Sequence, residues 1–178
     1  HCISSAASDV YKRQIWKNMM HFRIGNGFDA HKIKKGNGIT LGGIFIPCDY
    51  SLIAHSDGDI ISHTVCDALL GAANLGDIGV HFPNTKKFEN ISGKEMIESV
   101  LDKLQKQNYE ISNVDITYIG EVPRLNSHKH EIISCLSKFL KVEEEKISCK
   151  ATTTDQLGFM GKKEGVACLA NVLIYKNN

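Results

Sequence analysis

The chain alternates between stretches in which hydrophobic residues recur every three or four positions and stretches in which they recur at every second position. The first pattern is clearest over residues 92–107 and indicates an amphipathic helix. Ser92 is the expected N-cap of this helix, and Glu95 three residues later completes a capping box. The apolar stripe of this helix contains Met96, Ile97, Val100, Leu101 and Leu104.

Similar patterns predict two further helices and a set of strands. The helices are expected at residues 59–74 and 126–140, and a glycine after Leu75 provides a stop for the first of them. The polar segment 32–38 and the segment 80–91 are expected to be loops. Because helices and strands alternate, the predicted class is α/β, with segregation into an α+β arrangement left open. Strands are expected at residues 22–31, 114–118, 147–151 and 166–174. Residues 39–47, which surround two glycines, are expected to form a hairpin or a bulge.

Length and composition exclude several classes of protein. At 178 residues the chain is expected to form one domain with a substantial core. A net charge of +1 gives no signal for nucleic-acid binding, and no apolar run approaches the ~20 residues of a membrane span. The six cysteines are irregularly spaced and are interpreted as free thiols in a reducing compartment. Residues 1–19 are interpreted as an extension (a tag, a scar or a transit remnant), and residues 20–178 as the domain.

The densest group of polar side chains is the nine-residue stretch from His55 to His63, which is followed directly by an apolar run. Asp57, Gly58 and Asp59 indicate a turn and a helix start, because aspartate caps free backbone N–H groups. His63 is then expected about one turn inside the helix, where an unpaired polar group is costly. A metal ion would provide a partner for the His63 imidazole. Taken alone, however, His55 and His63 are each better explained as a cap or a core residue.

Asp29 and His31 form a second candidate pair, two positions apart in the first predicted strand. Side chains at i and i+2 point to the same face of a strand, so both are expected on one side of the sheet. Together with His63 they provide one carboxylate and two imidazoles. Three such ligands with an open fourth position are typical of a catalytic zinc site, whereas a structural site would more often use cysteine.

A third group, Thr152 to Asp155, follows a predicted strand and precedes a stretch rich in glycine and lysine at residues 158–165. Short hydroxyl donors, accessible backbone N–H groups and positive charge are what a phosphate group requires. Taken alone, the same residues are better explained as a β-branched strand end followed by a solvated turn.

The three groups, in this order, resemble the 2-C-methyl-D-erythritol 2,4-cyclodiphosphate synthase family of the non-mevalonate isoprenoid pathway. The resemblance extends from Phe22 to about Tyr175. Each of its motifs is ordinary by itself, and their order carries the resemblance. The motifs are Arg23-Ile24-Gly25 through His31, His55 through His63, Asp67 through Ala73, Leu75 through Gly79, Phe82-Pro83, Ala151 through Thr154, Leu157-Gly158-Phe159 and Glu164-Gly165.

The resemblance implies a single-domain protomer with a mixed β-sheet, helices packed on one face, and sheets that face the three-fold axis of a homotrimer. The active sites would lie between neighbouring protomers. The implied reaction converts 4-diphosphocytidyl-2-C-methyl-D-erythritol 2-phosphate to the 2,4-cyclodiphosphate and CMP, by attack of the 2-phosphate on the β-phosphate. Since both reacting groups are on one molecule, the protein has to fold the substrate and neutralise its charge.

Metal ligands follow from the resemblance by position. Asp29, His31 and His63 match the zinc ligands of the family, with one Zn²⁺ per protomer and a substrate phosphate oxygen in the open place. Asp155 matches the ligand of a second ion, Mg²⁺ or Mn²⁺, that spans the α- and β-phosphates. The family mostly has glutamate at this last position, so the shorter Asp155 side chain is a departure.

Catalytic and substrate-binding positions follow in the same way. His55 and Thr153 match the residues that stabilise the transition state. Departures from the family pattern lie at Asn84 and Lys86, where aspartate is frequent, and at Lys162, where arginine is frequent. The residues implied to contact substrate are Asp29, Ala30, His31, His55, Ser56, Asp77, Ile78, Gly79, Phe82, Pro83, Asn84, Thr85, Lys86, Gly120, Glu121, Val122, Pro123, Arg124, Leu125, Asn126, Thr152, Thr153, Thr154, Asp155, Phe159 and Lys162.

Partners and location are the last expectations drawn from the resemblance. An isoprenoid diphosphate is expected in a cavity on the trimer axis, bordered by Phe28, Lys162 and Glu164. Neither nucleic acid nor a membrane is expected as a partner. The implied location is the cytoplasm, or a plastid if residues 1–19 are a transit remnant.

Two alternatives stay open on the sequence. A zinc-dependent phosphohydrolase would use the same ligands and would need a general base near a metal-bound water, for which Asp57 and Asp59 are the candidates. A trimeric binding protein with a structural metal is the non-enzymatic alternative. The cysteine-free ligand set argues against it, because structural zinc sites are usually built from cysteine.

Overall fold

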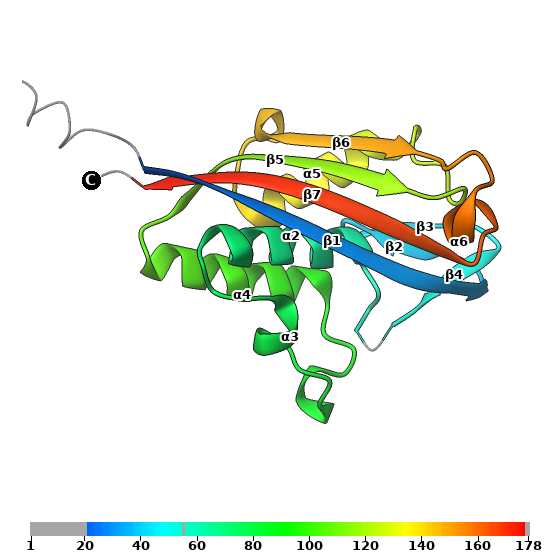
Figure 1. Ribbon diagram of the computed structural model, residues 1–178, viewed down its shortest axis with the longest axis horizontal. Coiled ribbons are helices and arrows are strands. Elements are labelled where there is room, and N and C mark those ends of the chain that lie inside the picture. The colour runs from blue at the N-terminus through cyan, green and yellow to red at the C-terminus, as the bar shows by residue number, and fades with distance from the viewer. Residues whose placement is uncertain (1–20, 55, 177–178) are drawn as a thin grey trace, which may run out of the picture.

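The computed structural model describes residues 21–54 and 56–176, and its centre is one mixed sheet. The strands of this sheet are β1 (His21–Lys35), β4 (Tyr50–Ile53), β5 (Glu110–Ile119), β6 (Ile147–Thr152) and β7 (Gly165–Lys176). They lie in the order β4–β1–β7–β5–β6 (Figure 1). β5 and β6 run parallel, and all other neighbours in this sheet run antiparallel. β2 (Ile39–Leu41) and β3 (Ile44–Ile46) form a separate hairpin.

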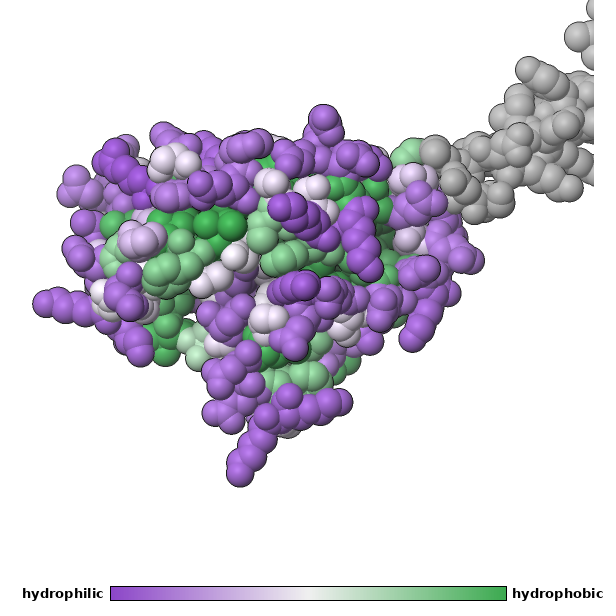
Figure 2. Space-filling view, turned by 180° about the vertical axis from the view of Figure 1, so that it is seen from behind, coloured by the Kyte–Doolittle hydropathy of each residue, from purple (hydrophilic) through white to green (hydrophobic). Residues whose placement is uncertain are grey.

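Three long helices cover one face of the sheet, as expected. α2 (Ile60–Ala72) packs against β1 and β7, α5 (Lys129–Leu140) packs against β6, and α4 (Gly93–Lys106) packs on α2. Figure 1 shows α2 and α5 behind the sheet. In the view from behind, hydrophilic side chains cover much of the surface, with hydrophobic residues grouped between them (Figure 2). The shorter elements are α3 (Ile78–His81), α6 (Gly158–Gly161) and the 3₁₀ helices η1 (Lys86–Phe88) and η2 (Glu144–Lys146).

Strand β1 has two chemically different faces. Gly25 and Gly27 face α2, and a Cβ atom at Gly27 would collide with the carbonyl oxygen of Thr64. Glycine is therefore required for this close approach of strand and helix. The opposite face leaves Phe22, Ile24 and Phe28 exposed, and Ile24 retains 74% of its accessible surface. Apolar side chains gathered on one open face indicate an interaction surface.

The predicted starts of two helices are confirmed, whereas the predicted glycine stop of α2 is wrong. Ser92 caps α4, and reciprocal bonds between Ser92 and Glu95 form the expected capping box. Asp59 caps α2 by accepting a hydrogen bond from the backbone N–H of Ser62 at 3.2 Å. α2 ends at Ala72, and the left-handed residue that follows it is Asn74, with a φ of +57°. Asparagine can take this conformation in place of glycine, and the N–H of Leu75 then bonds to the carbonyl of Leu70 at 2.9 Å.

Other sequence predictions are also wrong in extent, most clearly in three segments. Residues 32–35 continue β1 instead of beginning a loop, because they pair with β4, a strand that the hydrophobic pattern did not indicate. The loop expected at 80–91 contains the end of α3 and all of η1, since Asp77 caps the short helix α3. The third helix begins at Lys129 rather than at residue 126, because a turn in which the His128 N–H bonds to the carbonyl of Leu125 precedes it.

The described cysteines are free thiols, as predicted: Cys48, Cys66, Cys135, Cys149 and Cys168. Burial raises the pKa of the Cys66 thiol, and it raises that of Cys168 to about 12, so both stay protonated and behave as core residues. Cys2 and the predicted extension at residues 1–19 lie outside the described residues. None of the described helices combines the length and the apolar character that a membrane span needs.

Candidate functional site

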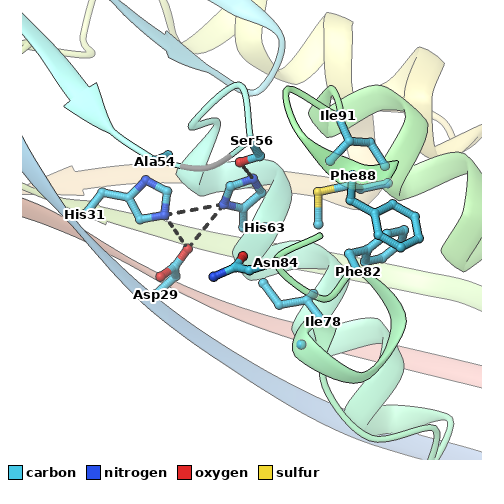
Figure 3. A pocket seen from close by; sticks show the side chains of 12 residues that line it. Asp29, His31, Ala54, Ser56, His63, Ile78, Phe82, Asn84, Phe88 and Ile91 are labelled. Carbon is cyan, nitrogen blue, oxygen red and sulfur yellow. Dashed lines mark hydrogen bonds and ion pairs between the residues drawn. The ribbon is translucent and has the colours of Figure 1, made fainter. Parts of the chain in front are cut away.

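Asp29, His31 and His63 meet where β1 and the start of α2 come together (Figure 3). Asp29 and His31 follow Gly25 and Gly27 at two-residue spacing, so they share the β1 face that packs toward α2. The His31 Nε2 atom lies 2.9 Å from Asp29 Oδ2. The His63 Nδ1 atom lies 3.4 Å from Asp29 Oδ2 and 3.4 Å from His31 Nε2. The predicted convergence of these three residues is confirmed.

The three ligand atoms fit one tetrahedrally coordinated ion. With metal–ligand bonds of about 2.0–2.1 Å, two ligands of a tetrahedral Zn²⁺ are about 3.3 Å apart. The observed separations of 2.9 and 3.4 Å are close to that value. All three residues line a cavity, so a fourth position is accessible from it. The donor set, with one carboxylate and two imidazoles, therefore suits a catalytic divalent metal.

Asp29 is held in its ionised form. Burial alone would raise the pKa of this carboxyl group, but hydrogen bonds from His31 and His63 outweigh burial and hold its pKa well below the usual range. Its other oxygen, Oδ1, accepts a hydrogen bond from the backbone N–H of Ala30 at 2.7 Å. The carboxylate is thus fixed in place and available as a ligand without first losing a proton.

The loop before α2 is tied to both neighbouring helices. His63 Nε2, the ring nitrogen that faces away from Asp29, lies 2.9 Å from Ser56 Oγ. Asp57 accepts hydrogen bonds from the backbone N–H groups of Asp59 at 3.0 Å and Gly93 at 2.7 Å. The second of these bonds joins the loop to the first residue of α4. The imidazole of His63 is therefore surrounded by fixed groups.

Asp59 connects the start of α2 to the β2–β3 hairpin. Its carboxylate, 1% exposed, accepts hydrogen bonds at 2.7 Å from the backbone N–H groups of Gly42 and Gly43. It also accepts bonds from the backbone N–H of Ser62 at 3.2 Å and the hydroxyl of Ser62 at 2.7 Å. Burial raises the pKa of Asp59, and the four bonds oppose that shift. Both oxygens are thus engaged in holding the helix that carries His63.

A cavity of about 320 Å³ opens from the metal ligands. Of the residues predicted to contact substrate, Ser56, Ile78, Gly79, Phe82 and Asn84 line this cavity together with the three ligands. Ile78 and Gly79 belong to the short helix α3, which is held by two aspartates. Four other residues predicted to contact substrate are neighbours of the lining residues in the chain: Asp77, Pro83, Thr85 and Lys86. The lining residues that sequence reasoning missed are Ala54, Phe88, Ile91 and Met96.

The two aspartates act on backbone N–H groups of α3. Asp67, on α2, accepts a hydrogen bond from the N–H of Ile78 at 2.8 Å, and Asp77 accepts one from the N–H of Val80 at 3.1 Å. Burial raises the pKa of Asp67, and the nearby carboxylate of Asp77 adds to the shift. The part of the cavity wall formed by α3 is thus attached to α2, the helix that carries His63.

The Thr152–Asp155 group lies apart from the metal ligands within one chain. Thr152 pairs with Ile119, Ile119 with Ala167, and Ala167 with Ala30. Three strand spacings of about 4.8 Å put Thr152 roughly 14 Å from Ala30 across the sheet. A second cavity, of about 330 Å³, is lined by Gly120, Pro123, Arg124, Leu125, Asn126, Ala151, Thr152 and Thr153. The structure therefore divides the predicted site residues into two groups.

The remaining predicted residues have various placements. Phe159 lines a third hollow with Ala30 and His31. Asp155 follows Thr154 and has a φ of +52°, which places it in a turn. Lys162 is exposed at the end of α6. Glu121, Val122 and Thr154 neighbour the second cavity in the chain without lining it. His55, predicted to stabilise the transition state, lies outside the described residues.

We expect the close packing of β1 on α2 to control how well the ligands converge. Gly27→Ala would place a methyl group against the Thr64 carbonyl and push the strand from the helix. Overpacking of this kind costs about 1–3 kcal/mol in unfolding free energy, and separation of Asp29 from His63 should also weaken Zn²⁺ binding. Urea denaturation and zinc titration measure the two effects.

The matched control for this variant is Gly71→Ala, at a helix position where an added Cβ meets no atom within 4 Å. Alanine at such a site should leave zinc binding unchanged and raise stability by up to about 1 kcal/mol. Equal stability and zinc affinity of Gly27→Ala and the unmodified protein would contradict the role given to the glycine.

The sequence of the chain is similar to the sequences of known proteins. The profile of the YgbB family matches residues 22–175. A 2-C-methyl-D-erythritol 2,4-cyclodiphosphate synthase from Francisella philomiragia is 46% identical over 158 residues, covering 85% of this chain and 99% of that protein. The protein with the same name from Saccharophagus degradans is 44% identical over 153 residues, covering 85% of this chain and 99% of that protein.

Solved structures agree with this similarity. IspF from Plasmodium falciparum in complex with CDP aligns with a TM-score of 0.79 and 38% identity, over 88% of this chain and 97% of that chain. The bifunctional IspDF from Campylobacter jejuni aligns with a TM-score of 0.86 and 38% identity over 90% of this chain. The present chain spans 44% of the length of that bifunctional protein.

Proposed function

Because the chain belongs to the YgbB family, we propose that it converts 4-diphosphocytidyl-2-C-methyl-D-erythritol 2-phosphate to 2-C-methyl-D-erythritol 2,4-cyclodiphosphate and CMP. This is a step in isoprenoid precursor synthesis. The observation that carries the proposal is the Asp29–His31–His63 triad at the mouth of a cavity, in a chain aligned over nearly the full length of synthases of that name.

The chemistry needs positioning and charge neutralisation rather than a protein nucleophile. An oxygen of the 2-phosphate forms a bond to the β-phosphorus. The bond from that phosphorus to the oxygen bridging to the α-phosphate breaks, and CMP leaves with this oxygen. Since nucleophile and electrophile belong to one substrate molecule, holding them near each other supplies much of the rate enhancement.

The residues around the triad are suited to the methylerythritol phosphate end of the substrate. Ser56 contacts a phosphate, the backbone of residues 77–79 holds the hydroxylated chain, and Phe82 with the other apolar lining residues faces its carbon skeleton. When bound at the triad, Zn²⁺ supplies positive charge that neutralises and orients phosphate oxygens. His55 and Thr153 stabilise the transition state in this proposal.

The second cavity is assigned to the cytidine diphosphate end. Its lining residues include Arg124, Thr152 and Thr153, which offer a guanidinium and hydroxyl groups for a nucleotide diphosphate. The complex of the Plasmodium falciparum relative with CDP supports a cytidine diphosphate ligand for this fold. Asp155 is the proposed ligand of a second ion, Mg²⁺ or Mn²⁺, since hard cations prefer carboxylate oxygen.

We place the complete active site between neighbouring copies of the chain in a homotrimer. Two features support this assembly: the separation of the two cavities within one chain, and the exposed Phe22, Ile24 and Phe28 on the open face of β1. In such a trimer, Phe28 with Lys162 and Glu164 borders an axial cavity for an isoprenoid diphosphate.

Mixing inactive His31→Ala and Thr153→Ala variants should restore activity, because some sites then receive two intact halves. No recovery after verified subunit exchange would contradict the shared site.

The decisive test of the reaction is product analysis. Purified protein incubated with the diphosphocytidyl substrate and Zn²⁺ should release CMP and the cyclic diphosphate in equal amounts. A phosphohydrolase would instead give an open-chain product, and a binding protein would give none. The phosphohydrolase reading is also weakened by Asp59, whose two oxygens are taken up by four hydrogen bonds and are not available as a base.

Asp155 is expected to matter through its charge. Asp155→Asn should lower the rate of CMP release by about 10²-fold, which is about 3 kcal/mol in activation free energy, while zinc content stays unchanged. Asp155→Glu should keep or raise activity, because its longer side chain has the usual reach of the family. If Asp155 only caps a turn, asparagine would serve equally well. A near-native rate with the same Mg²⁺ dependence in Asp155→Asn would remove the residue from the metal site.

A further inference from the structure

His63 presents its two ring nitrogens to two different environments. Nδ1 faces the carboxylate of Asp29 and the ring of His31, each at 3.4 Å. Nε2 faces the hydroxyl of Ser56 at 2.9 Å (Figure 3). The side chain of His63 is only 6% exposed, so bulk water has little access to it. The orientation of this ligand is therefore decided by groups of the protein.

The proton count of the ring follows from this arrangement. A metal ion at Nδ1 takes the lone pair of that nitrogen, so the single N–H hydrogen of a neutral imidazole is on Nε2. Ser56 Oγ is then the acceptor of this hydrogen. The carboxylate of Asp57 also faces this nitrogen, but at 3.9 Å from Nε2 it is too distant for a direct hydrogen bond.

The hydrogen bonds of the Ser56 hydroxyl can be assigned in the same way. Its oxygen also accepts a hydrogen bond from the backbone N–H of Gly58 at 3.2 Å. A serine oxygen has two acceptor positions and one hydrogen to donate. With the bonds from Gly58 and His63 both positions are used, and the remaining hydroxyl hydrogen is free to point into the cavity that Ser56 lines.

We propose that Ser56 is a positioning residue for the metal centre: by accepting the Nε2–H hydrogen of His63 it holds the imidazole in the form that presents Nδ1 to the ion. The same contact orients the Ser56 hydroxyl hydrogen toward a phosphate oxygen beside the ion. This inference rests on the proposed function and deepens it. A partner for the second nitrogen of a metal-bound histidine raises ligand basicity and fixes the ring.

The experiment measures the affinity of the full-length chain for Zn²⁺ alone, by competition with a chromophoric chelator and without substrate. Ser56→Ala should weaken zinc binding by about 10- to 100-fold, the usual effect of losing such a partner. Ser56→Thr retains a hydroxyl and should stay within about threefold of the unmodified protein. The matched control is Ser51→Ala, which loses a hydroxyl bonded to the Gly38 carbonyl at 3.0 Å, away from the ligands. It should bind zinc normally.

A second readout separates positioning from folding. In zinc-loaded protein with ¹⁵N-labelled histidine, the His63 signals should show a metal-bound Nδ1 and a protonated Nε2 whose hydrogen exchanges slowly with water. In Ser56→Ala this exchange should become faster, while the unfolding temperature of the metal-free protein stays unchanged.

The outcomes distinguish this inference from the proposed function. Equal zinc affinity of Ser56→Ala and the unmodified protein would overturn the positioning role and leave the synthase reaction standing, with Ser56 as a phosphate contact only. Failure of the unmodified protein to bind zinc would overturn both.

Discussion

Replacing His63 by alanine is expected to abolish the proposed zinc binding and to lower the rate of CMP release by about 10³-fold or more, which is about 4 kcal/mol in activation free energy. The remaining candidate ligands, Asp29 and His31, lie on one strand and would contact an ion from one side only. Two ligands cannot complete the three-ligand set of a catalytic zinc site. Elemental analysis of the purified variant gives zinc per chain, and a CMP assay gives the rate.

The control for this experiment is His130→Ala. The His130 side chain is 87% exposed on α5 and lies 3.9 Å from Glu144, remote from the ligands. Its loss should change neither zinc content nor turnover. Full zinc occupancy in His63→Ala would refute the assignment of this residue as a ligand.

The largest expected effect on stability belongs to Asp59. Asp59→Ala should lower the free energy of unfolding by about 3–5 kcal/mol, because it leaves several buried donors without a partner and opens a void at the start of α2. The donors are the N–H groups of Gly42, Gly43 and Ser62 and the hydroxyl of Ser62. Urea denaturation of the metal-free protein measures the loss without any contribution from zinc.

Asp59→Asn and a surface aspartate complete this experiment. Asparagine keeps one acceptor oxygen and should cost less than alanine, since part of the bonding is retained. Asp102→Ala, at an exposed position of α4, should change stability by no more than about 0.5 kcal/mol. A change of similar size in Asp59→Ala would show that the buried carboxylate does not hold the hairpin to the helix.

The predictions that succeeded rest on local rules. Asp29 and His31 were placed on one face by the two-residue period of a strand, and His63 one turn into a helix by the capping preference of Asp59. The capping box at Ser92 is likewise decided within four residues. These features could be predicted because their causes lie within a short stretch of sequence.

The elements that were missed depend on contacts between distant residues. Three of the four residues in 32–35 are lysines, and this segment is a strand because β4 supplies backbone partners. The cavity wall shows the same limit. Ile91 and Met96 come from different segments and are hydrophobic like the residues of the core. Nothing in the sequence therefore marks them as lining a site. Convergence of the three ligands was predictable, but the shape of the space beside them was not.

The alternation of β1 has a consequence for how this segment can change over evolutionary time. Gly25, Gly27, Asp29 and His31 occupy one parity of the strand, and the exposed Phe22, Ile24 and Phe28 occupy the other. A residue inserted just after Gly27 would reverse every side chain that follows, turning both ligands outward and Phe28 against the helix. Such a change of length would remove the metal centre and disturb the open face in one step. We therefore expect homologous chains to differ here by substitution while the number of residues stays constant.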